Sequence, residues 1–93
     1  MKCIKKNNKF VLEDELGNFR GEMTFKLKDD NVIVVDHTYV PKEFAGQGYA
    51  RVLLNNVVEY AKENNFKILP VCAYVKSKLN NDSEYNDIEI CEE

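Results

Sequence analysis

Two side chains and one turn in this sequence could carry chemistry. Cys72 ends a short apolar stretch, residues 67–72, and stands two residues before Tyr74. A cysteine attacks carbonyl groups as its thiolate, whereas most free cysteines are small buried apolar residues. Cys72 is therefore a candidate nucleophile, with plain packing as the alternative.

His37 is the single histidine of the chain. Histidine is the side chain that readily exchanges a proton near neutral pH, so it is a candidate acid or base. Strand alternation places it on the face of Ile33 and Val35 unless a bulge intervenes. A partly buried structural histidine is the alternative. Its candidate polar partners, each with a structural alternative, are Asp36, Thr38, Glu43 and Tyr85.

The turn with two close glycines, Gly46-Gln47-Gly48, lies between a strand-like and a helix-like segment. The first N–H groups of a helix have no partner within the helix, and the helix dipole adds partial positive charge there. The first turn carries Arg51 and no carboxylate, while Glu59 and Glu63 lie toward the other end. This charge pattern favours an anion site at residues 40–51, although a plain reversal of the chain is the alternative.

The length of 93 residues suits one domain. The net charge of −3 and the scattered lysines disfavour nucleic-acid binding. No apolar run is long enough to cross a membrane, and the N-terminus lacks a signal-peptide core, so we expect a cytoplasmic protein. Cys3, Cys72 and Cys91 show no metal-type spacing and favour a reducing compartment.

Alternation of apolar and polar residues predicts three antiparallel strands, at residues 10–13, 19–28 and 32–40. The run Val32-Ile33-Val34-Val35 predicts that the third strand is central and covered on both faces. Residues 1–9, rich in lysine and asparagine, carry no strand prediction.

A one-sided apolar pattern predicts a helix from Tyr49 to about residue 63, ended by Asn64-Asn65. A strand follows at residues 67–72, parallel to the third strand, and Pro70 makes it an edge strand or turns it away from its neighbour. Residues 73–79 predict a short second helix, and residues 89–93 a frayed acidic tail.

Several short motifs stand in a characteristic order between residues 34 and 88. They are Asp36-His37-Thr38-Tyr39-Val40-Pro41, Gly46-Gln47-Gly48, Tyr60-Ala61, Pro70-Val71-Cys72-Ala73-Tyr74-Val75 and Glu84-Tyr85. This order resembles the small, single-domain branch of the GNAT (GCN5-related N-acetyltransferase) superfamily. The resemblance implies one minimal acetyltransferase domain over residues 1–93. Its implied class is α/β (α+β): a mostly antiparallel twisted sheet with a parallel β-α-β unit, one long helix and a short C-terminal helix.

The resemblance also implies roles for individual residues. The family binds the pyrophosphate of acetyl-CoA through backbone amides of the glycine loop, and no metal is implied. The implied cofactor-binding residues are Val40, Gly46, Gln47, Gly48, Tyr49, Ala50 and Arg51. Cys72 would lie near the thioester as a nucleophile or acyl carrier, with His37 as the matching histidine. Tyr74 would protonate the leaving CoA thiolate or line the channel.

The chain departs from the family pattern in two places. Glu43 and Ala45 stand where relatives carry glutamine or arginine and a basic residue, which removes one phosphate-pairing side chain. Asp82-Ser83 stands where relatives carry His-Pro, so the role of that histidine does not transfer.

The resulting hypothesis is an acetyl-CoA-dependent N-acetyltransferase that acts on an unidentified amine, small molecule or protein, either directly or through Cys72. The expected assembly is a monomer or weak dimer without nucleic-acid or membrane partners. One alternative is a non-catalytic module that binds or senses acyl-CoA and acts with a protein partner. Another is an interaction domain that has lost the cofactor.

Overall fold

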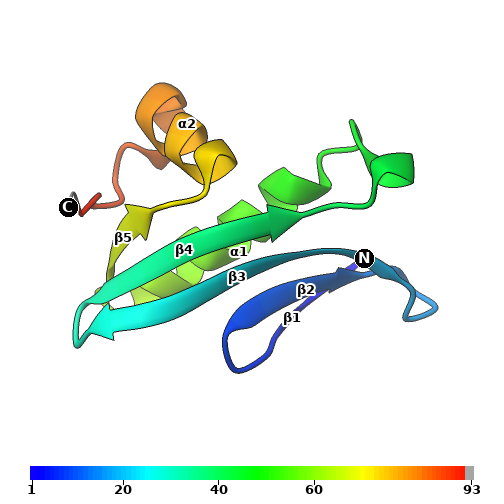
Figure 1. The fold of residues 1–93 in the computed structure, drawn as a ribbon, viewed down its shortest axis with the longest axis horizontal. Helices are drawn as coiled ribbons and strands as arrows, with labels where there is room; N and C mark the ends of the chain where they lie inside the picture. Colours follow the sequence, from blue (N-terminus) through cyan, green and yellow to red (C-terminus); the bar gives the residue numbers. More distant parts are fainter. Residues whose placement is uncertain (92–93) are drawn as a thin grey trace.

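The computed structural model describes residues 1–91 as a five-stranded sheet with a long helix behind it (Figure 1). The strands, in sheet order, are β1 (Lys2–Lys5), β2 (Lys9–Glu13), β3 (Phe19–Asp29), β4 (Val32–Tyr39) and β5 (Lys67–Pro70). The helices are α1 (Tyr49–Glu63) and α2 (Ala73–Asn81), with 3₁₀ turns η1 (Lys42–Phe44) and η2 (Ser83–Tyr85). β1 to β4 form an antiparallel meander and β5 is parallel to β4, which confirms the predicted α+β class.

The central strand is β4, as its apolar run predicts. It pairs with β3 on one side and β5 on the other, and all four residues from Val32 to Val35 are buried. Ile33 and Val35 belong to the main core, whereas Val32 and Val34 pack with Leu69 on the opposite face. Both faces of this strand are therefore covered near its start.

Helix α1 supplies one wall of the main core. Its buried residues follow the predicted stripe: Leu53, Leu54, Val57, Val58 and Ala61. The sheet supplies the facing wall through Leu12, Met23 and Phe25. The helix ends as expected, because Asn65 has the left-handed φ of 58° that asparagine tolerates. A short helix, α2, follows β5, also as predicted (Figure 1).

Strand β1 is a correction to the sequence analysis, which predicted no strand before residue 10. β1 pairs antiparallel with β2, so that Cys3 lies opposite Leu12 and Ile4 opposite Val11. The polar composition of residues 1–9 gives little strand signal of its own. Pairing with a neighbour that is already in the sheet provides the stability, because strand propensity depends strongly on context.

The acidic tail is the second correction. Ile68 donates its N–H to the carbonyl of Glu89 and accepts from the N–H of Cys91, so Ile90 lies beside β5 in a parallel bridge. An edge strand leaves backbone groups open, and these residues satisfy them. The predicted fraying of residues 89–91 is therefore wrong; residues 92 and 93 lie outside the described part of the chain.

Three irregularities interrupt the strand pairing around β3. In β3, Arg20 is an extra residue relative to β2, and Lys28 is an extra residue relative to β4. In β4, Asp36 is an extra residue relative to β3. A bulge shifts the alternation of side chains by one residue and thereby changes the face to which they point. Two of these bulges decide which side chains reach the candidate site.

Candidate active site

The site begins where β4 and β5 separate. Their parallel pairing runs from Val32 with Lys67 to Val35 with Pro70 and stops there. The carbonyl of Val35 accepts hydrogen bonds from both Val71 and Cys72, each at 3.0 Å, which closes the ladder. β5 ends at Pro70, and the chain beyond it turns away from β4 into α2 (Figure 1). The missing N–H of Pro70 faces the outer edge of the sheet, because Ile68, two residues earlier, bonds Glu89 and Cys91 on that side, whereas Val71 bonds Val35 of β4. Of the two alternatives predicted for Pro70, the edge strand is confirmed, because β5 is the last strand in the sheet order; its pairing with β4 also ends at this residue.

Cys72 lies at the vertex of this divergence. It is the N-cap residue of α2, and its partly buried free thiol packs at the border of the main core. The sulfur lies 3.3 Å from the hydroxyl oxygen of Thr38, and either atom can be the donor. The β4 side chain that contacts the sulfur of Cys72 is thus Thr38.

His37 lies on the other face of the sheet. Directly paired residues of antiparallel strands share a face, and His37 pairs with the partly buried Thr24, whereas Thr38 pairs with the fully buried Met23. The bulge at Asp36 causes this reversal of the alternation that starts at Val35. His37 is exposed, and the hydroxyl of Thr24 donates to Asp36 at 2.6 Å beside it. The sequence predicted that His37 shares the face of Ile33 and Val35 unless a bulge intervenes. A bulge does intervene, at Asp36, and the face predicted from regular alternation is wrong.

Tyr74 stands in the first turn of α2, two residues after Cys72, and is half-buried. Burial raises the pKa of its phenol above the ordinary value of 10.0, while the positive charge of Arg51 acts in the opposite direction. The phenol therefore stays protonated at neutral pH and can donate a hydrogen bond or a proton.

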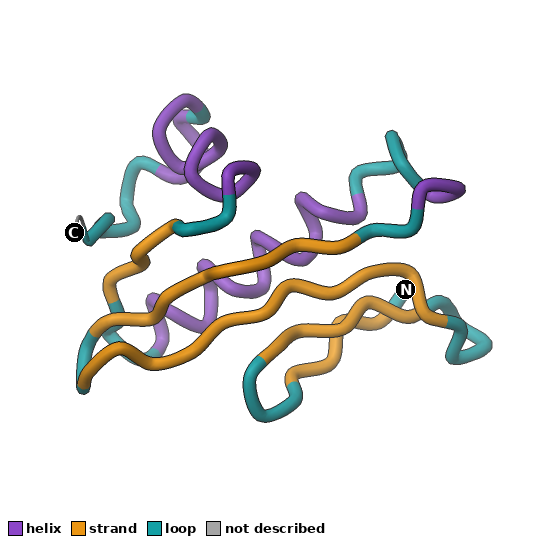
Figure 2. Tube along the Cα trace, viewed as in Figure 1, coloured by secondary structure: helices purple, strands orange, loops and turns teal. Residues whose placement is uncertain are grey.

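The glycine loop at residues 45–48 lies at the far end of β4, before α1 (Figure 2). Gly46 and Gly48 have positive φ values of 83° and 80°, a conformation that side chains with a Cβ rarely adopt. The first helical hydrogen bond runs from Val52 to Gly48. Within residues 1–91, the backbone N–H groups of residues 46–51 donate no hydrogen bond. The loop thus presents open donors at a helix start that has no acidic residue.

Side chains around the loop are occupied elsewhere. The hydroxyl of Tyr49 donates to Gln47 at 3.1 Å, and Val40 packs against the main core. Arg51 donates to Asp82 at 2.9 Å and also to Glu84, and its guanidinium lies over the ring of Tyr85. Because two carboxylates balance the charge of Arg51, an anion at this loop would be held by backbone donors first.

Sequence reasoning missed the roles of Thr38 and Asp82. Thr38 appeared there only as one of several polar partners, because its contact with Cys72 depends on a bulge that no composition signal marks. Asp82 appeared only as a departure from the family pattern, although it is the N-cap of η2 and partner of Arg51. An acidic residue before a short helical turn is a capping signal that could have placed it.

Among residues 1–91, no three or more histidine, cysteine or acidic side chains gather as a potential metal site. No helix in the same part of the chain is long and apolar enough to cross a membrane.

Comparison with known proteins gives the family. The model of the GCN5-related N-acetyltransferase family matches residues 9–88. A GCN5-like protein from Staphylococcus aureus, solved in solution, is 38% identical; the match covers 99% of this chain and 90% of that one with a TM-score of 0.79. This chain therefore belongs to the GCN5-related N-acetyltransferase (GNAT) family, as its motifs indicate. Its class of enzyme is that of the N-acetyltransferases.

More distant structures share the fold. A GNAT family acetyltransferase from Elizabethkingia anophelis with acetyl-CoA bound is 18% identical, covering 83% of this chain and 51% of that one, with a TM-score of 0.64. YhbS from Escherichia coli in complex with CoA is also 18% identical, covering 83% and 43%, with a TM-score of 0.62. This chain thus spans about half of these proteins or less. No curated protein sequence is a significant match.

Proposed function

We propose that this protein transfers the acetyl group of acetyl-CoA to an amine at the divergence of β4 and β5. The observation that carries the proposal is the contact of Cys72 with Thr38 at the vertex of the divergence. The open amides of residues 46–51, at the far end of β4, supply a second requirement, a cradle for the pyrophosphate. Acetyl-CoA is the cosubstrate that presents both a diphosphate and a thioester.

The proposed reaction proceeds through an acetyl-cysteine. The thiolate of Cys72 attacks the thioester carbonyl, the bond from carbonyl carbon to CoA sulfur breaks, and the CoA thiolate takes a proton. Tyr74 is the proposed donor, because its phenol is protonated at neutral pH. The neutral amine then attacks the acetyl-cysteine, and the bond from the carbonyl carbon to the cysteine sulfur breaks. The amine proton passes to the Tyr74 phenolate, so that Tyr74 and the Cys72 thiolate return to their starting states. In this scheme Thr38 orients the thiol.

Mass spectrometry tests the covalent step. Incubation of the protein with acetyl-CoA should add one acetyl group at Cys72, and Cys72→Ala should lose that adduct and at least about 100-fold in kcat. Cys91→Ala is the matched control, because it removes another partly buried cysteine. This variant should leave the acetyl adduct and kcat unchanged. Undiminished turnover of Cys72→Ala would contradict the acyl-enzyme and leave direct transfer from acetyl-CoA to the amine.

Calorimetry tests the cosubstrate separately. We expect both CoA and acetyl-CoA to bind with micromolar constants and to raise the melting temperature through mass action. Binding without transfer to any amine in a panel would support a non-catalytic acyl-CoA-binding module. A dissociation constant of millimolar or weaker for both ligands would overturn the proposal.

A further inference from the structure

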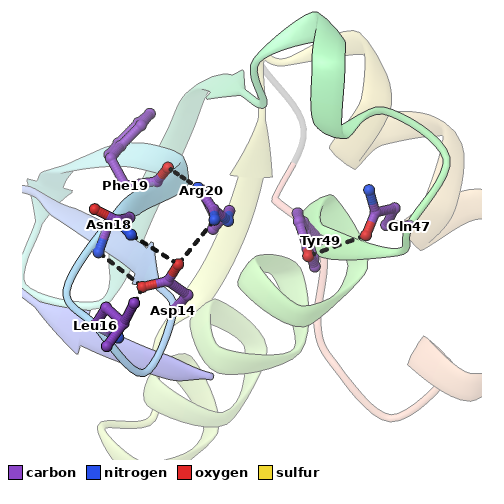
Figure 3. Close-up of polar contacts among 7 residues, drawn as sticks. All are labelled: Asp14, Leu16, Asn18, Phe19, Arg20, Gln47 and Tyr49. Carbon is purple, nitrogen blue, oxygen red and sulfur yellow. Dashed lines mark hydrogen bonds and ion pairs between the residues drawn. The ribbon is translucent and has the colours of Figure 1, made fainter.

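Arg20 connects two loops at the same end of the sheet, the β2–β3 turn and the segment before the glycine loop (Figures 2 and 3). It is the extra residue of the bulge between β2 and β3, because Leu12 pairs with Gly21 while the next residue, Glu13, pairs with Phe19. The bulge places Arg20 out of the regular alternation, and its guanidinium reaches the ring of Phe44. A regular strand would not aim the side chain in this way.

The guanidinium is held on one side by a rigid turn. One of its nitrogens donates to the carboxylate of Asp14 at 2.8 Å, and another donates to the carbonyl of Phe19 at 3.2 Å. Asp14 is itself fixed, because it accepts from the backbone N–H groups of Leu16 and Asn18 at 2.9 and 2.8 Å. Figure 3 shows this arrangement, with Arg20 between the turn and Tyr49. The side chains of Arg20 and Asp14 are only 21% and 20% exposed, so the ion pair is partly shielded from water.

On its other side the guanidinium faces the glycine loop. Its central carbon lies 4.1 Å from the centre of the Phe44 ring, a close cation–π contact. Phe44 ends η1, two residues before Gly46, and its ring lies 6.4 Å from that of Tyr49 at the start of α1. Tyr49 in turn donates to Gln47 inside the loop. The contacts therefore run without interruption from Asp14 through Arg20 and Phe44 to both ends of the loop.

We propose that Arg20 is a positioning residue for the glycine loop. By clamping Phe44 against the Asp14 turn, it fixes the start of the loop and thereby the direction of the amides of residues 46–51. The proposal rests on the proposed function, since those amides are the expected pyrophosphate site. It also gives a loop without a side-chain cap an anchor close to its two glycines of positive φ. Arg20 acts through Phe44 and is not itself a ligand of CoA in this proposal.

The first test compares CoA affinity with stability. Arg20→Ala should raise the Kd for CoA and the KM for acetyl-CoA about five- to tenfold and leave kcat within twofold, because only the binding loop is loosened. Arg20→Lys should recover part of this loss, since it keeps the charge opposite Asp14 but not the planar group over the ring. Phe44→Leu should match Arg20→Ala, and the double variant should be no worse than either one.

Lys9→Ala is the matched control. It removes a different ion pair of β3, the one between Lys9 of β2 and Glu22 at 3.3 Å, for which no contact with Phe44 or residues 45–48 is found among the described residues. This variant should leave the Kd unchanged. The proposal is overturned if Arg20→Ala lowers the free energy of unfolding but keeps the Kd within twofold of the wild type, or if the Arg20 and Phe44 effects simply add.

Backbone ¹⁵N relaxation without ligand separates this inference from the proposed function. In the wild type, the amides of Gly46 and Gly48 should have order parameters near the rigid value of about 0.85, falling toward 0.6 in Arg20→Ala. If the wild type binds no CoA, the proposed function fails while this measurement still decides the role of Arg20. Equal order parameters in both proteins would overturn the inference even where CoA binds well.

Discussion

The glycine loop and the β4–β5 divergence lie at opposite ends of one stretch of β4, and they prepare a ligand site in different ways. The loop offers backbone donors in a conformation that two glycines make accessible, while the charge of Arg51 in the first turn of α1 is balanced by Asp82 and Glu84. The divergence offers side chains, with Cys72 and Thr38 in contact. The first site depends on backbone conformation, and the second on which face each side chain occupies.

This difference predicts separable phenotypes. Changes in the loop should alter the binding of CoA with little effect on the chemical step. Changes at the divergence should alter the chemical step with little effect on binding, because no phosphate contact is lost there.

The largest expected effect belongs to Gly48→Asp. The new carboxylate would stand among the open N–H groups and compete with the ligand's phosphates, while like charges about 4 Å apart repel by roughly 4 kcal/mol at an effective dielectric constant of 20. We expect at least a 100-fold rise in the Kd for CoA by calorimetry, with the fold retained. Gly48→Asn is the matched control, because asparagine tolerates φ near 80° and carries no charge. Equal loss in both variants would assign the effect to strain.

The next effect concerns the packing that carries β4 into the loop. A Cβ added at Gly21 would lie 3.0 Å from the carbonyl oxygen of Tyr39, 3.2 Å from Val40 and 3.3 Å from Leu53. Gly21→Ala should therefore cost about 1–3 kcal/mol of unfolding free energy, measured by urea denaturation. Val40 leads into the glycine loop and Leu53 lies in α1, which follows the loop. We therefore expect CoA binding to weaken more than kcat falls. An unchanged free energy of unfolding would show that the atoms around Gly21 at this end of β4 shift at little cost to admit the methyl group.

The sequence predicted the elements that depend on strong local patterns. The alternation of β3, the apolar start of β4 and the stripe of α1 each contain their own signal. Pro70 indicates an edge strand, because it has no N–H to donate to a further strand. Strand β1 escaped prediction because its stability comes from pairing with β2 rather than from residues 2–5 themselves.

The side chains of the candidate site were predicted less completely than the loop. A glycine turn before a helix implies open donors whatever surrounds it. The identity of the partner of Cys72 depends instead on the bulge at Asp36, which exchanges Thr38 for His37 on the face of the cysteine. Bulges arise from pairing across strands, so a single strand's sequence does not reveal them.

Thr38→Val tests the divergence alone. Valine keeps the shape of threonine but removes the hydroxyl that contacts Cys72, and one neutral hydrogen bond contributes about 1 kcal/mol. We expect kcat for acetyl transfer to fall about fivefold with the Kd for CoA unchanged. Thr24→Val is the control, because that hydroxyl bonds Asp36 on the opposite face of the sheet. A larger loss of kcat in Thr24→Val than in Thr38→Val would indicate that the chemical step depends on the face that carries His37.

The smallest effect tests the contact that joins the loop to the segment after α2. The pKa of Asp82 lies below its ordinary value of 3.8, first because Glu84 donates its backbone N–H and then because Arg51 donates a hydrogen bond. A lowered pKa means that the folded state favours the charged carboxylate. Its stabilising contribution is therefore present above about pH 4 and is lost as the pH falls through the lowered pKa.

Asp82→Asn removes this titration and the charge of one Arg51 partner. We expect the midpoint of acid unfolding, followed by circular dichroism, to rise by roughly a few tenths of a pH unit, because the variant lacks the contribution of the carboxylate above the lowered pKa. Asp30→Asn in the exposed β3–β4 turn removes the same charge and should not shift it. The variant also frees part of the charge of Arg51 beside the loop, so its Kd for CoA should fall slightly. A higher Kd would mean that Arg51 supports CoA binding through its position, which only the intact ion pair with Asp82 maintains.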